Sequence, residues 1–307
     1  MLSVIIPAYN EQEMIGECAE TVRGLLEKED IPFEILFVDD GSKDDTWSAV
    51  LEESKKDKRV RGVHFSRNFG KEAALFAGLE QALGDCCVTM DCDLQHPPEK
   101  MVEMYRLWEQ GYEVVEGVKS NRGSESAGHK TAAGIFYKWI SKAVGTDMSN
   151  ASDFKLLDRK VVDTLNSLPE RQVFFRALSF WVGYRKAEVS YEVRERKAGT
   201  SKWSTGKLIG YAFRNISSFT SAPLHIIVTL GVLMLIVSLV LGITALVQKI
   251  TGVAVEGFTT VILIQLFSGS VMMISMGIIG YYIARIYDEV KGRPRYVISE
   301  ICGEAKK

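Results

Sequence analysis

The sequence has little net charge and few cysteines, and both features limit the partners and the compartment that fit it. Lysine and arginine number 37 against 39 aspartates and glutamates, so the formal net charge is only −2. Such a balance gives no electrostatic basis for a nucleic-acid partner. The cysteines show neither metal-ligand nor disulfide spacing, so we expect structural thiols in a reducing compartment. They are Cys18, Cys86, Cys87, Cys92 and Cys302.

Three common sequence signatures are also missing. No Gly-x-Gly-x-x-Gly follows the first apolar run, and no Gly-x-x-x-x-Gly-Lys-Ser/Thr occurs. Dinucleotide-binding and phosphate-loop folds therefore lose support, and a nucleotide pocket here would need another construction. The first residues lack the basic, apolar and small-residue succession of a secretory leader, so we expect no cleaved signal peptide.

What is present is an alternation of short apolar runs with helical periodicity. The runs typical of strands are Leu2 to Ile6, Ile35 to Val38, Val60 to Phe65, Cys86 to Met90 and Val114 to Val118. The helical patterns cover roughly Glu11 to Glu29, Asp44 to Lys56, Lys71 to Leu83 and Pro98 to Gln110. This alternation predicts an α/β fold with a largely parallel sheet covered by helices on both faces.

Polar residues directly follow several of these strands. Asp39-Asp40-Gly41-Ser42 follows the second strand, and Asp91-Cys92-Asp93-Leu94-Gln95 follows the fourth. Open α/β sheets bind ligands at the carboxyl edge of their strands. Two carboxylates one residue apart, with an amide oxygen two positions on, suit a divalent cation that keeps sites for diphosphate oxygens. Acidic pairs in such loops are more often turn or cap residues, but the neighbouring motifs favour a nucleotide diphosphate.

Two uncharged apolar stretches follow this α/β region. Ile226 to Val247 and Phe258 to Ala284 both exceed the ~20 residues that a helix needs to cross a bilayer. They predict a transmembrane hairpin, the alternative being buried helices of a soluble protein. Basic residues flank the pair, so the positive-inside rule places both flanks in the cytoplasm. The flanking residues are Lys202, Lys207, Arg214, Arg285, Lys291, Arg293 and Arg295.

The stretch before the first span has apolar residues at near-helical spacing. Leu208, Tyr211, Phe213 and Phe219 belong to this pattern, with Lys207 beside it. Periodicity alone fits a helix in the membrane interface or an amphipathic helix packed on the soluble domain. Its position before the span favours the interface. We therefore expect a catalytic domain over 1–203, an interfacial region over 204–222, two transmembrane helices within 223–285 and a cytoplasmic tail over 286–307.

The strand-end motifs together identify a family. Pro7-Ala8-Tyr9-Asn10-Glu11, the Asp39 to Ser42 run and Asp91 to Glu99 resemble the inverting family 2 glycosyltransferases of GT-A fold. Within that family the chain is similar to the polyprenyl-phosphate glycosyltransferases, the group of bactoprenol glucosyltransferase and dolichol-phosphate mannosyl synthase. Residues Ser152 to Arg159 and Arg196 to Trp203 resemble this subgroup as well, as does the hydrophobic tail. The resemblance implies a GT-A (Rossmann-like) nucleotide-sugar-binding domain followed by an α-helical transmembrane hairpin.

The processive members of the wider family carry a signature that this chain lacks. Their Gln-x-x-Arg-Trp motif is missing, because Gln172 to Arg176 has a different spacing. The resemblance therefore implies a single-transfer enzyme. Two small departures from the subgroup are Cys92, at a position often held by alanine, and Lys119, where arginine is common. Neither disables the implied chemistry.

The resemblance also assigns roles to residues by motif. Asp93 and Gln95 would bind Mg²⁺ or Mn²⁺ bridging the diphosphate, with Asp91 facing the nucleotide and the metal. Cations that engage phosphate oxygens are expected at Lys119, Arg122, Arg196 and Lys202. Contacts to the nucleotide sugar are expected at Pro7, Tyr9, Glu11, Val38, Asp40, Lys71, Asp91 and Cys92.

Asp153 matches the position that is often treated as the family's catalytic base, and with Asp93 it completes the expected catalytic residues. A phosphate monoester has its second pKa near ~6, so the acceptor is mostly a dianion at neutral pH and needs little base catalysis. Asp153 could instead position the sugar or the acceptor. The plain alternative is a helix-cap carboxylate before Phe154.

We expect an inverting, metal-dependent enzyme that transfers a hexose, with glucose from UDP-glucose the first choice, to undecaprenyl phosphate at the cytoplasmic face of the cell membrane. UDP-N-acetylglucosamine, GDP-mannose or a modified pentose donor would use the same motifs. An alternative of another class is a non-catalytic membrane scaffold that recruits a flippase or a downstream glycosyltransferase. Small residues in the second span would permit a homo-oligomer or packing inside one hairpin.

Overall fold

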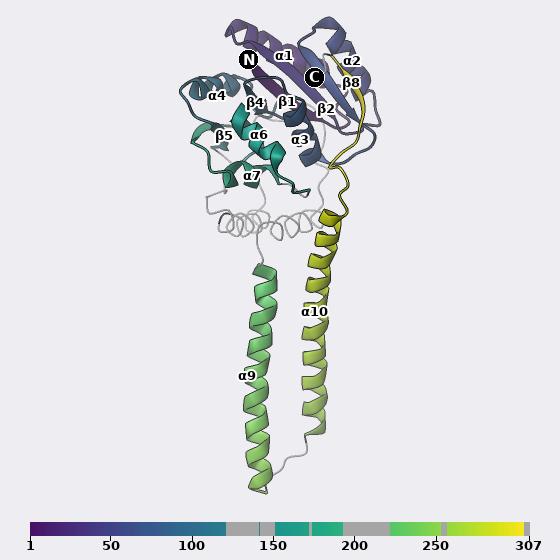
Figure 1. Cartoon of the computed structure of the whole chain (residues 1–307), viewed down its shortest axis with the longest axis vertical. Coiled ribbons are helices and arrows are strands. Elements are labelled where there is room, and N and C mark those ends of the chain that lie inside the picture. The colour runs from purple at the N-terminus through teal and green to yellow at the C-terminus, as the bar shows by residue number, and fades with distance from the viewer. Residues whose placement is uncertain (121–140, 142–150, 172–173, 193–221, 253–256, 304–307) are drawn as a thin grey trace. The chain divides into compact units, whose positions relative to one another are not determined.

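The computed structural model describes residues 1–120, 141, 151–171, 174–192, 222–252 and 257–303. The chain forms two units. One comprises Met1–Ala212 and Pro294–Lys307 and holds a mixed sheet with its helices, and the other is Phe213–Arg293 and holds two long helices (Figure 1). Residues 294–303 therefore belong to the same unit as the amino-terminal strand.

The described strands form one eight-stranded sheet in the order β7-β5-β6-β4-β1-β2-β3-β8. Its centre is parallel, because β1 pairs in parallel with both β2 and β4, and β2 pairs in parallel with β3. The strands are β1 (Leu2–Ala8), β2 (Phe33–Asp39), β3 (Val60–Phe65), β4 (Cys86–Thr89), β5 (Val114–Lys119), β6 (Lys155–Asp158), β7 (Lys186–Tyr191) and β8 (Ile298–Cys302). All five strands expected from the sequence are confirmed, with ends shifted by at most two residues.

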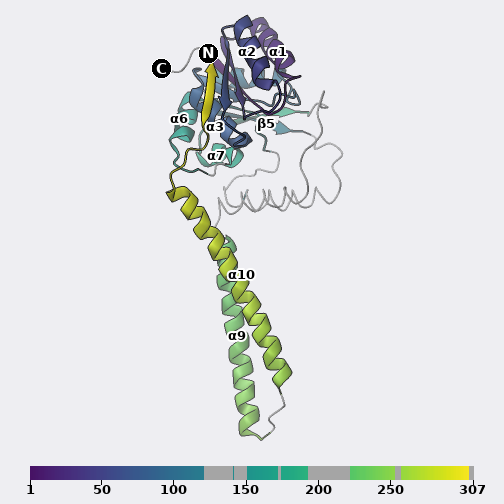
Figure 2. The same ribbon diagram turned by 90° about the vertical axis from the view of Figure 1, so that its right-hand side faces the viewer.

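Two strands run against the others. β6 lies between β4 and β5 and is antiparallel to both, and β8 is antiparallel to β3 at the sheet edge. β8 is the yellow arrow of Figure 2. The amino ends of β6 and β8 therefore lie at the same edge as the carboxyl ends of the parallel strands. Within the stretch that the sequence assigned only to a tail, Ile298–Cys302 thus forms an edge strand.

Helices cover both faces of the sheet, as the continuous apolar runs of the central strands require. Leu2, Val4 and Ile6 belong to a buried cluster with apolar residues of α1, α2 and α4. Ile5 points to the other face, where a side chain at Gly78 of α3 would collide with it. The helices of this unit are α1 (Ile15–Lys28), α2 (Thr46–Lys56), α3 (Lys71–Gln81), α4 (Glu99–Glu109), α6 (Arg159–Ser167) and α7 (Phe175–Trp181).

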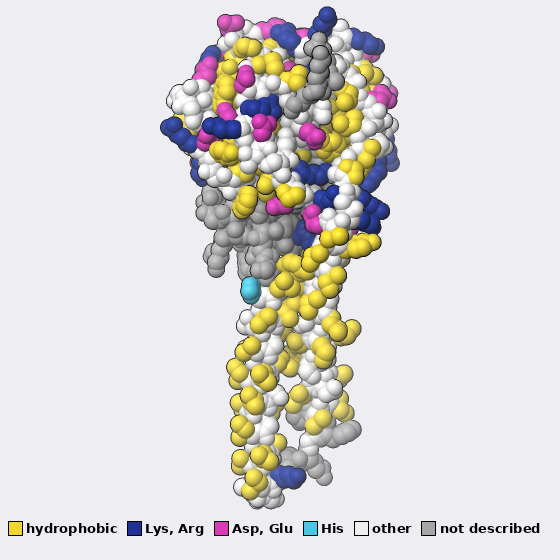
Figure 3. All heavy atoms as spheres, viewed as in Figure 1, with side chains coloured by type: hydrophobic (Ala, Val, Ile, Leu, Met, Phe, Trp, Pro, Cys, Tyr) yellow, Lys and Arg dark blue, Asp and Glu magenta, His cyan; other side chains and the backbone are white. Residues whose placement is uncertain are grey.

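The second unit consists of α9 (Ala222–Ile250) and α10 (Phe258–Val290), which lie side by side in both views (Figures 1 and 2). Within them, Leu224–Ile250 and Val261–Val290 are long and apolar enough to cross a membrane. Hydrophobic side chains cover much of these helices, and no residue in the most apolar stretch of either helix is buried (Figure 3). The expected hairpin of two apolar helices is present, and it indicates membrane association.

Candidate active site

The polar residues expected at a nucleotide site gather at one edge of the sheet. β1, β2, β4 and β5 all run in the same direction, so their carboxyl ends meet there. Pro7 lies in β1 near this edge and is followed by Tyr9 and Glu11, while Val38 lies in β2 and Asp40 follows it. The candidate metal motif, Asp91 to Gln95, follows β4, and Lys119 is the last residue of β5.

The loops after β1 and β2 are bound to each other. The amide of Asn10 donates to the Ser42 hydroxyl at 2.9 Å, and the amide of Lys43 donates to the Asn10 side-chain oxygen at 2.9 Å. The amide of Glu11 donates to the Thr46 hydroxyl, also at 2.9 Å. These bonds hold the loops after β1 and β2 against each other, as a preformed ligand site requires.

Asp40 organises the loop that follows β3. Its carboxylate accepts hydrogen bonds from the amides of Phe69 at 2.6 Å and Gly70 at 2.9 Å. Burial raises the pKa of Asp40 to about 6, against the effect of these two bonds. Gly41 has φ +64, and a Cβ there would collide with the backbone of Arg67. The close approach of the two loops therefore depends on glycine at this position.

The metal motif forms a tight turn after β4. The Asp93 carboxylate accepts from the amide of Gln95 at 3.1 Å, and Leu94 between them has the unusual φ of +55. The amide of Asp91 donates to Nδ1 of His96 at 3.2 Å, so this imidazole is the neutral tautomer with its proton on Nε2. His96 stacks on Phe154 with ring centroids 5.0 Å apart. Two hydrogen bonds from backbone amides to side chains therefore stabilise the turn, one from Asp91 and one from Gln95.

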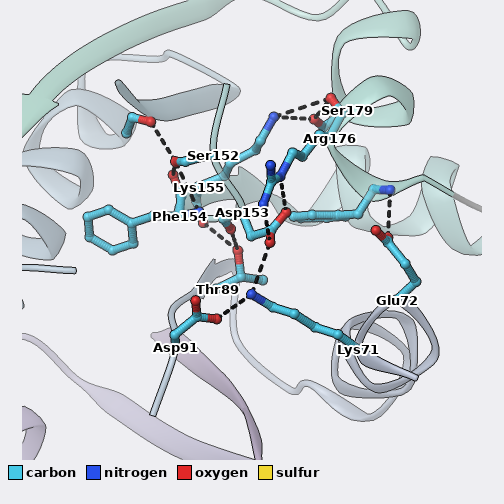
Figure 4. A network of polar contacts seen from close by, with 12 residues as sticks. Lys71, Glu72, Thr89, Asp91, Ser152, Asp153, Phe154, Lys155, Arg176 and Ser179 are labelled. Carbon is cyan, nitrogen blue, oxygen red and sulfur yellow. Dashed lines mark hydrogen bonds and ion pairs between the residues drawn. The ribbon is translucent and has the colours of Figure 1, made fainter. Parts of the chain in front are cut away.

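A chain of ion pairs joins this turn to Asp153 (Figure 4). Nζ of Lys71 lies 2.5 Å from Oδ1 of Asp91 and 2.9 Å from Oδ2 of Asp153. Arg176 donates to both oxygens of Asp153, from Nε at 2.6 Å and from Nη2 at 2.8 Å. Asp153 precedes β6 and not a helix, so the helix-cap interpretation does not apply. Two carboxylates and two cations from four different segments therefore meet at the sheet edge.

The charges in this cluster set one another's protonation. Burial alone would raise the pKa of Asp153, but Arg176 and Lys71 outweigh it and hold that pKa well below its usual value. The Lys71 side chain is 42% exposed, and its pKa is raised because Asp153 and Asp91 stabilise the ammonium by more than desolvation disfavours it. Burial, and then the Arg176 charge, lower the pKa of Lys119. Asp153 is therefore held as an anion between two cations.

Glu72 joins α3 to α7 beside this cluster. Its carboxylate accepts from the amide of Phe175 at 2.8 Å, at the first residue of α7. Burial, and then the charge of Asp153, raise the pKa of Glu72 to about 7. Behind the cluster, Lys155 is fully buried with its Nζ 3.2 Å from the Glu116 carboxylate and 2.7 Å from the Ser179 hydroxyl. These contacts fix α7, which carries Arg176.

The donor set after β4 suits a divalent metal. Asp91, Asp93 and Gln95 offer carboxylate and amide oxygens, which Mg²⁺ and Mn²⁺ prefer, and diphosphate oxygens would supply further ligands. Among the described residues, no group of three or more His, Cys, Asp or Glu side chains has a metal-site geometry. The residues thus fit a metal that is held jointly with a diphosphate rather than in a complete protein cage.

Two residues of this site were not expected from the sequence, and three expected residues lie outside the part of the chain that the structure describes. Arg176 and Glu72 were not expected, since a lone Arg in a short helix and a Glu in the first turn of another are ordinary surface patterns. Their signal is the proximity to Asp153, which only the fold provides. Three expected phosphate-binding residues lie outside the described residues, namely Arg122, Arg196 and Lys202.

The sequence is similar to those of several known proteins. The model of the family described as "Glycosyl transferase family 2" matches residues 3–165. The chain is 36% identical over 301 residues to the SfII prophage-derived bactoprenol glucosyl transferase of Shigella flexneri, covering 97% of each chain. It is 39% identical over 302 residues to the putative glycosyltransferase CsbB of Bacillus subtilis, covering 98% of this chain and 92% of the relative.

A solved structure agrees in fold. The glucosyl-3-phosphoglycerate synthase of Mycobacterium tuberculosis, in complex with Mn²⁺, UDP and phosphoglyceric acid, superposes with a TM-score of 0.52 at 20% identity. The match covers 71% of this chain and 76% of that one. It supports the same sheet architecture for the first unit.

Proposed function

The chain belongs to glycosyl transferase family 2, and on that basis we propose that it transfers glucose from UDP-glucose to undecaprenyl phosphate at a membrane. The observation that carries the proposal is the similarity to bactoprenol glucosyl transferase over almost the whole of both chains. That similarity extends through the two apolar helices, which a lipid-linked acceptor would explain. The GT-A fold supplies the nucleotide-sugar site.

The site residues divide into donor and acceptor groups in this proposal. The loops after β1 and β2 would contact the nucleoside, and Asp40 would keep the Ser66–Gly70 loop in place. Asp91, Asp93 and Gln95 would hold Mg²⁺ or Mn²⁺, which when bound offsets the charge that develops on the departing diphosphate. Lys71 lies beside Asp91 and would add positive charge at the same diphosphate.

Asp153 acts in this scheme as an anchor for cations and not as a base. Its carboxylate is committed to Arg176 and Lys71, and its pKa is held well below the usual value. The acceptor phosphate is already a dianion near neutral pH, so its oxygen can attack the anomeric carbon without losing a proton. Arg176 and Lys119 would steer that phosphate to the face opposite the leaving diphosphate, which gives inversion.

The membrane arrangement follows from the two apolar helices. We propose that α9 and α10 cross the bilayer as a hairpin, with the catalytic unit and both termini on the cytoplasmic side where basic residues concentrate. This proposal includes a catalytic domain over 1–203 and an interfacial region over 204–222. It also includes phosphate contacts from Arg122, Arg196 and Lys202. Recruitment of a flippase or a downstream glycosyltransferase as partner, or of a second copy of the chain, is included as well.

The proposal is tested by supplying detergent-purified protein with undecaprenyl phosphate and a panel of radiolabelled UDP- and GDP-sugars, with Mg²⁺ or Mn²⁺. We expect label in the lipid phase from UDP-glucose alone, lost on addition of EDTA and in Asp93→Ala. Transfer from UDP-N-acetylglucosamine or GDP-mannose instead would correct the donor and keep the reaction. No transfer from any donor, in folded protein, would favour a scaffold.

A further inference from the structure

The segment that follows the second apolar helix, Pro294 to Cys302, is built into the catalytic unit. It belongs to the same compact unit as the sheet, although α10 precedes it directly. Its strand β8 pairs antiparallel with β3, with Glu300 opposite His64 and Ile298 opposite Phe65. We refer to Pro294–Cys302 as the C-terminal segment. It begins at the sheet edge where the candidate active site lies.

The C-terminal segment contacts the nucleotide side of the site. Tyr296 stacks on Phe65, with ring centroids 5.0 Å apart, and the carbonyl of Val297 accepts from the amide of Ser66 at 3.0 Å. Ser66 opens the loop that the Asp40 carboxylate holds at Gly70. Both ends of this loop are therefore fixed, one by Asp40 and the other by the C-terminal segment.

A second contact reaches the end of β2. Nε1 of Trp47 donates to the Glu300 carboxylate at 2.9 Å, and the Trp47 ring stacks on His64 at 5.1 Å. Nδ1 of His64 lies 2.8 Å from the buried carboxylate of Asp39, which also accepts from the amide of Ser42 at 3.0 Å. β8 is thus connected through two aromatic rings to the motif that carries Asp40.

Arg295 contacts elements that carry residues of the ion-pair cluster. Its Nε donates to the carbonyl of Glu170 at 2.9 Å, and its Nη2 donates to the carbonyls of Leu168 and Glu170. Its guanidinium lies over the ring of Phe76, with Cζ 4.8 Å from the centroid. Phe76 belongs to α3, while Leu168 and Glu170 follow α6 and lead toward α7. One side chain therefore bridges α3 to the segment before α7.

The two bridged elements carry the two cations of Asp153. Lys71 is the first residue of α3, and Arg176 is the second residue of α7. The helices also contact each other through Phe76 and Phe175, whose rings meet edge to face at 6.3 Å, and through the bond from the Phe175 amide to Glu72. A shift of α7 relative to α3 would therefore change at least one of the two cation distances to Asp153.

We propose that Arg295 is a positioning residue of the catalytic centre, which holds α3 and α7 so that Lys71 and Arg176 both reach Asp153. In this proposal the C-terminal segment supports the geometry of the active site. The expected effect of Arg295 on the transfer rate rests on the proposed transferase function. The expected effect on hydrogen–deuterium exchange does not, because the contacts of Arg295 involve no substrate.

The planar guanidinium suits this place better than an ammonium would. It donates to two carbonyls while its face packs on Phe76, a combination that lysine cannot reproduce. Removal of Arg295 leaves the carbonyls of Leu168 and Glu170 without this charge-assisted donor and removes packing from α3. We expect Arg295→Lys to restore part of the contact and Arg295→Ala none.

The test compares full-length Arg295→Ala and Arg295→Lys with Arg293→Ala, a control that removes the same charge at an exposed position two residues earlier. Hydrogen–deuterium exchange is measured at the first turns of α3 and α7, together with UDP affinity and the rate of transfer to undecaprenyl phosphate. We expect faster exchange at both turns in Arg295→Ala, a kcat lower by about tenfold and a UDP Kd within about threefold of wild type. Arg295→Lys should be intermediate and Arg293→Ala unchanged.

The outcomes separate this inference from the proposed function. Exchange in Arg295→Ala equal to that in Arg293→Ala, or equal loss of rate in both, would overturn the positioning role. Faster exchange at α3 and α7 in a protein whose wild type transfers no sugar would reject the transferase proposal and support the bridge. A fall in kcat without any change in exchange would also contradict the inference, because Arg295 would then act by another route.

Discussion

Arg176 and Asp153 form a two-point ion pair, with Nε and Nη2 of the guanidinium 2.6 and 2.8 Å from the two carboxylate oxygens. The same carboxylate contacts Nζ of Lys71 at 2.9 Å, and Lys71 also reaches Asp91 in the candidate metal motif. The position often regarded as a catalytic base is thus occupied by a carboxylate that holds two cations. In the proposed reaction the acceptor is a phosphate, whose oxygen is already charged and needs no base.

Loss of the Asp153 charge should lower the rate of transfer. Asp153→Asn keeps the shape of the side chain but leaves Lys71 and Arg176 without their shared anion. We expect kcat to fall by about a hundredfold, because the cations are no longer held at the diphosphate and acceptor. Steady-state transfer from UDP-glucose measures the effect.

The control for that variant is Asp163→Asn, at an exposed carboxylate of α6. It should keep the wild-type rate. Because the pKa of Asp153 lies well below its usual value, the wild-type profile of rate against pH should show no acid limb from Asp153 between pH 5 and 9. An unchanged rate in Asp153→Asn, or a limb that this variant removes, would contradict the anchoring role.

Glu72 should make stability depend on pH in a defined direction. Its pKa is raised from 4.5 to about 7, chiefly by burial. A raised pKa means that the protonated form is favoured in the folded state, so this stabilisation is present below pH 4.5 and is lost as pH rises through 7. Glu72→Gln cannot ionise, and its amide oxygen can still accept from Phe175.

Thermal unfolding of Glu72→Gln and wild type at pH 5 and pH 8 tests this direction. The difference in Tm in favour of the variant should be larger at pH 8. The matched control is Glu103→Gln, whose carboxylate is exposed on α4 and pairs with Lys100. A Tm difference that is the same at both pH values would show that Glu72 does not titrate in this range.

Asp40 should support nucleotide binding through the loop that it holds. Asp40→Ala removes the acceptor of the Phe69 and Gly70 amides, so the Ser66–Gly70 loop is expected to loosen. We expect the Kd for UDP, measured by calorimetry, to rise by about tenfold. Asp163→Ala should leave it unchanged. Unaltered UDP affinity in Asp40→Ala would mean that this loop does not border the nucleotide.

Local patterns were sufficient for the central sheet and for the residues at its strand ends. The apolar runs of β1 to β5 are bounded by proline, glycine and acidic residues, so strand type and the polar edge followed from sequence alone. Asp91, Asp153 and Lys71 were named as candidates and lie together in the structure. The resemblance to a family supplied Asp153, which no local pattern singled out.

The remaining features depend on contacts between distant parts of the chain. β6 inserts between β4 and β5, and β8 joins β3 after the two apolar helices, and neither pairing has a local signal. Arg176 and Arg295 look like ordinary surface arginines in the sequence. Their roles arise only because the fold places one beside Asp153 and the other between α3 and the chain before α7.

The most direct test of the central claim follows the phosphorus atoms of the reaction. Full-length protein in detergent is given UDP-glucose, undecaprenyl phosphate and Mg²⁺ or Mn²⁺, and ³¹P NMR records the products. Hexosyl transfer converts the lipid phosphate from a monoester to a diester and releases UDP in equal amount, which is the result we predict. Release of UMP with a lipid diphosphate, or a lipid monoester that stays unchanged in the presence of folded protein, would contradict the account.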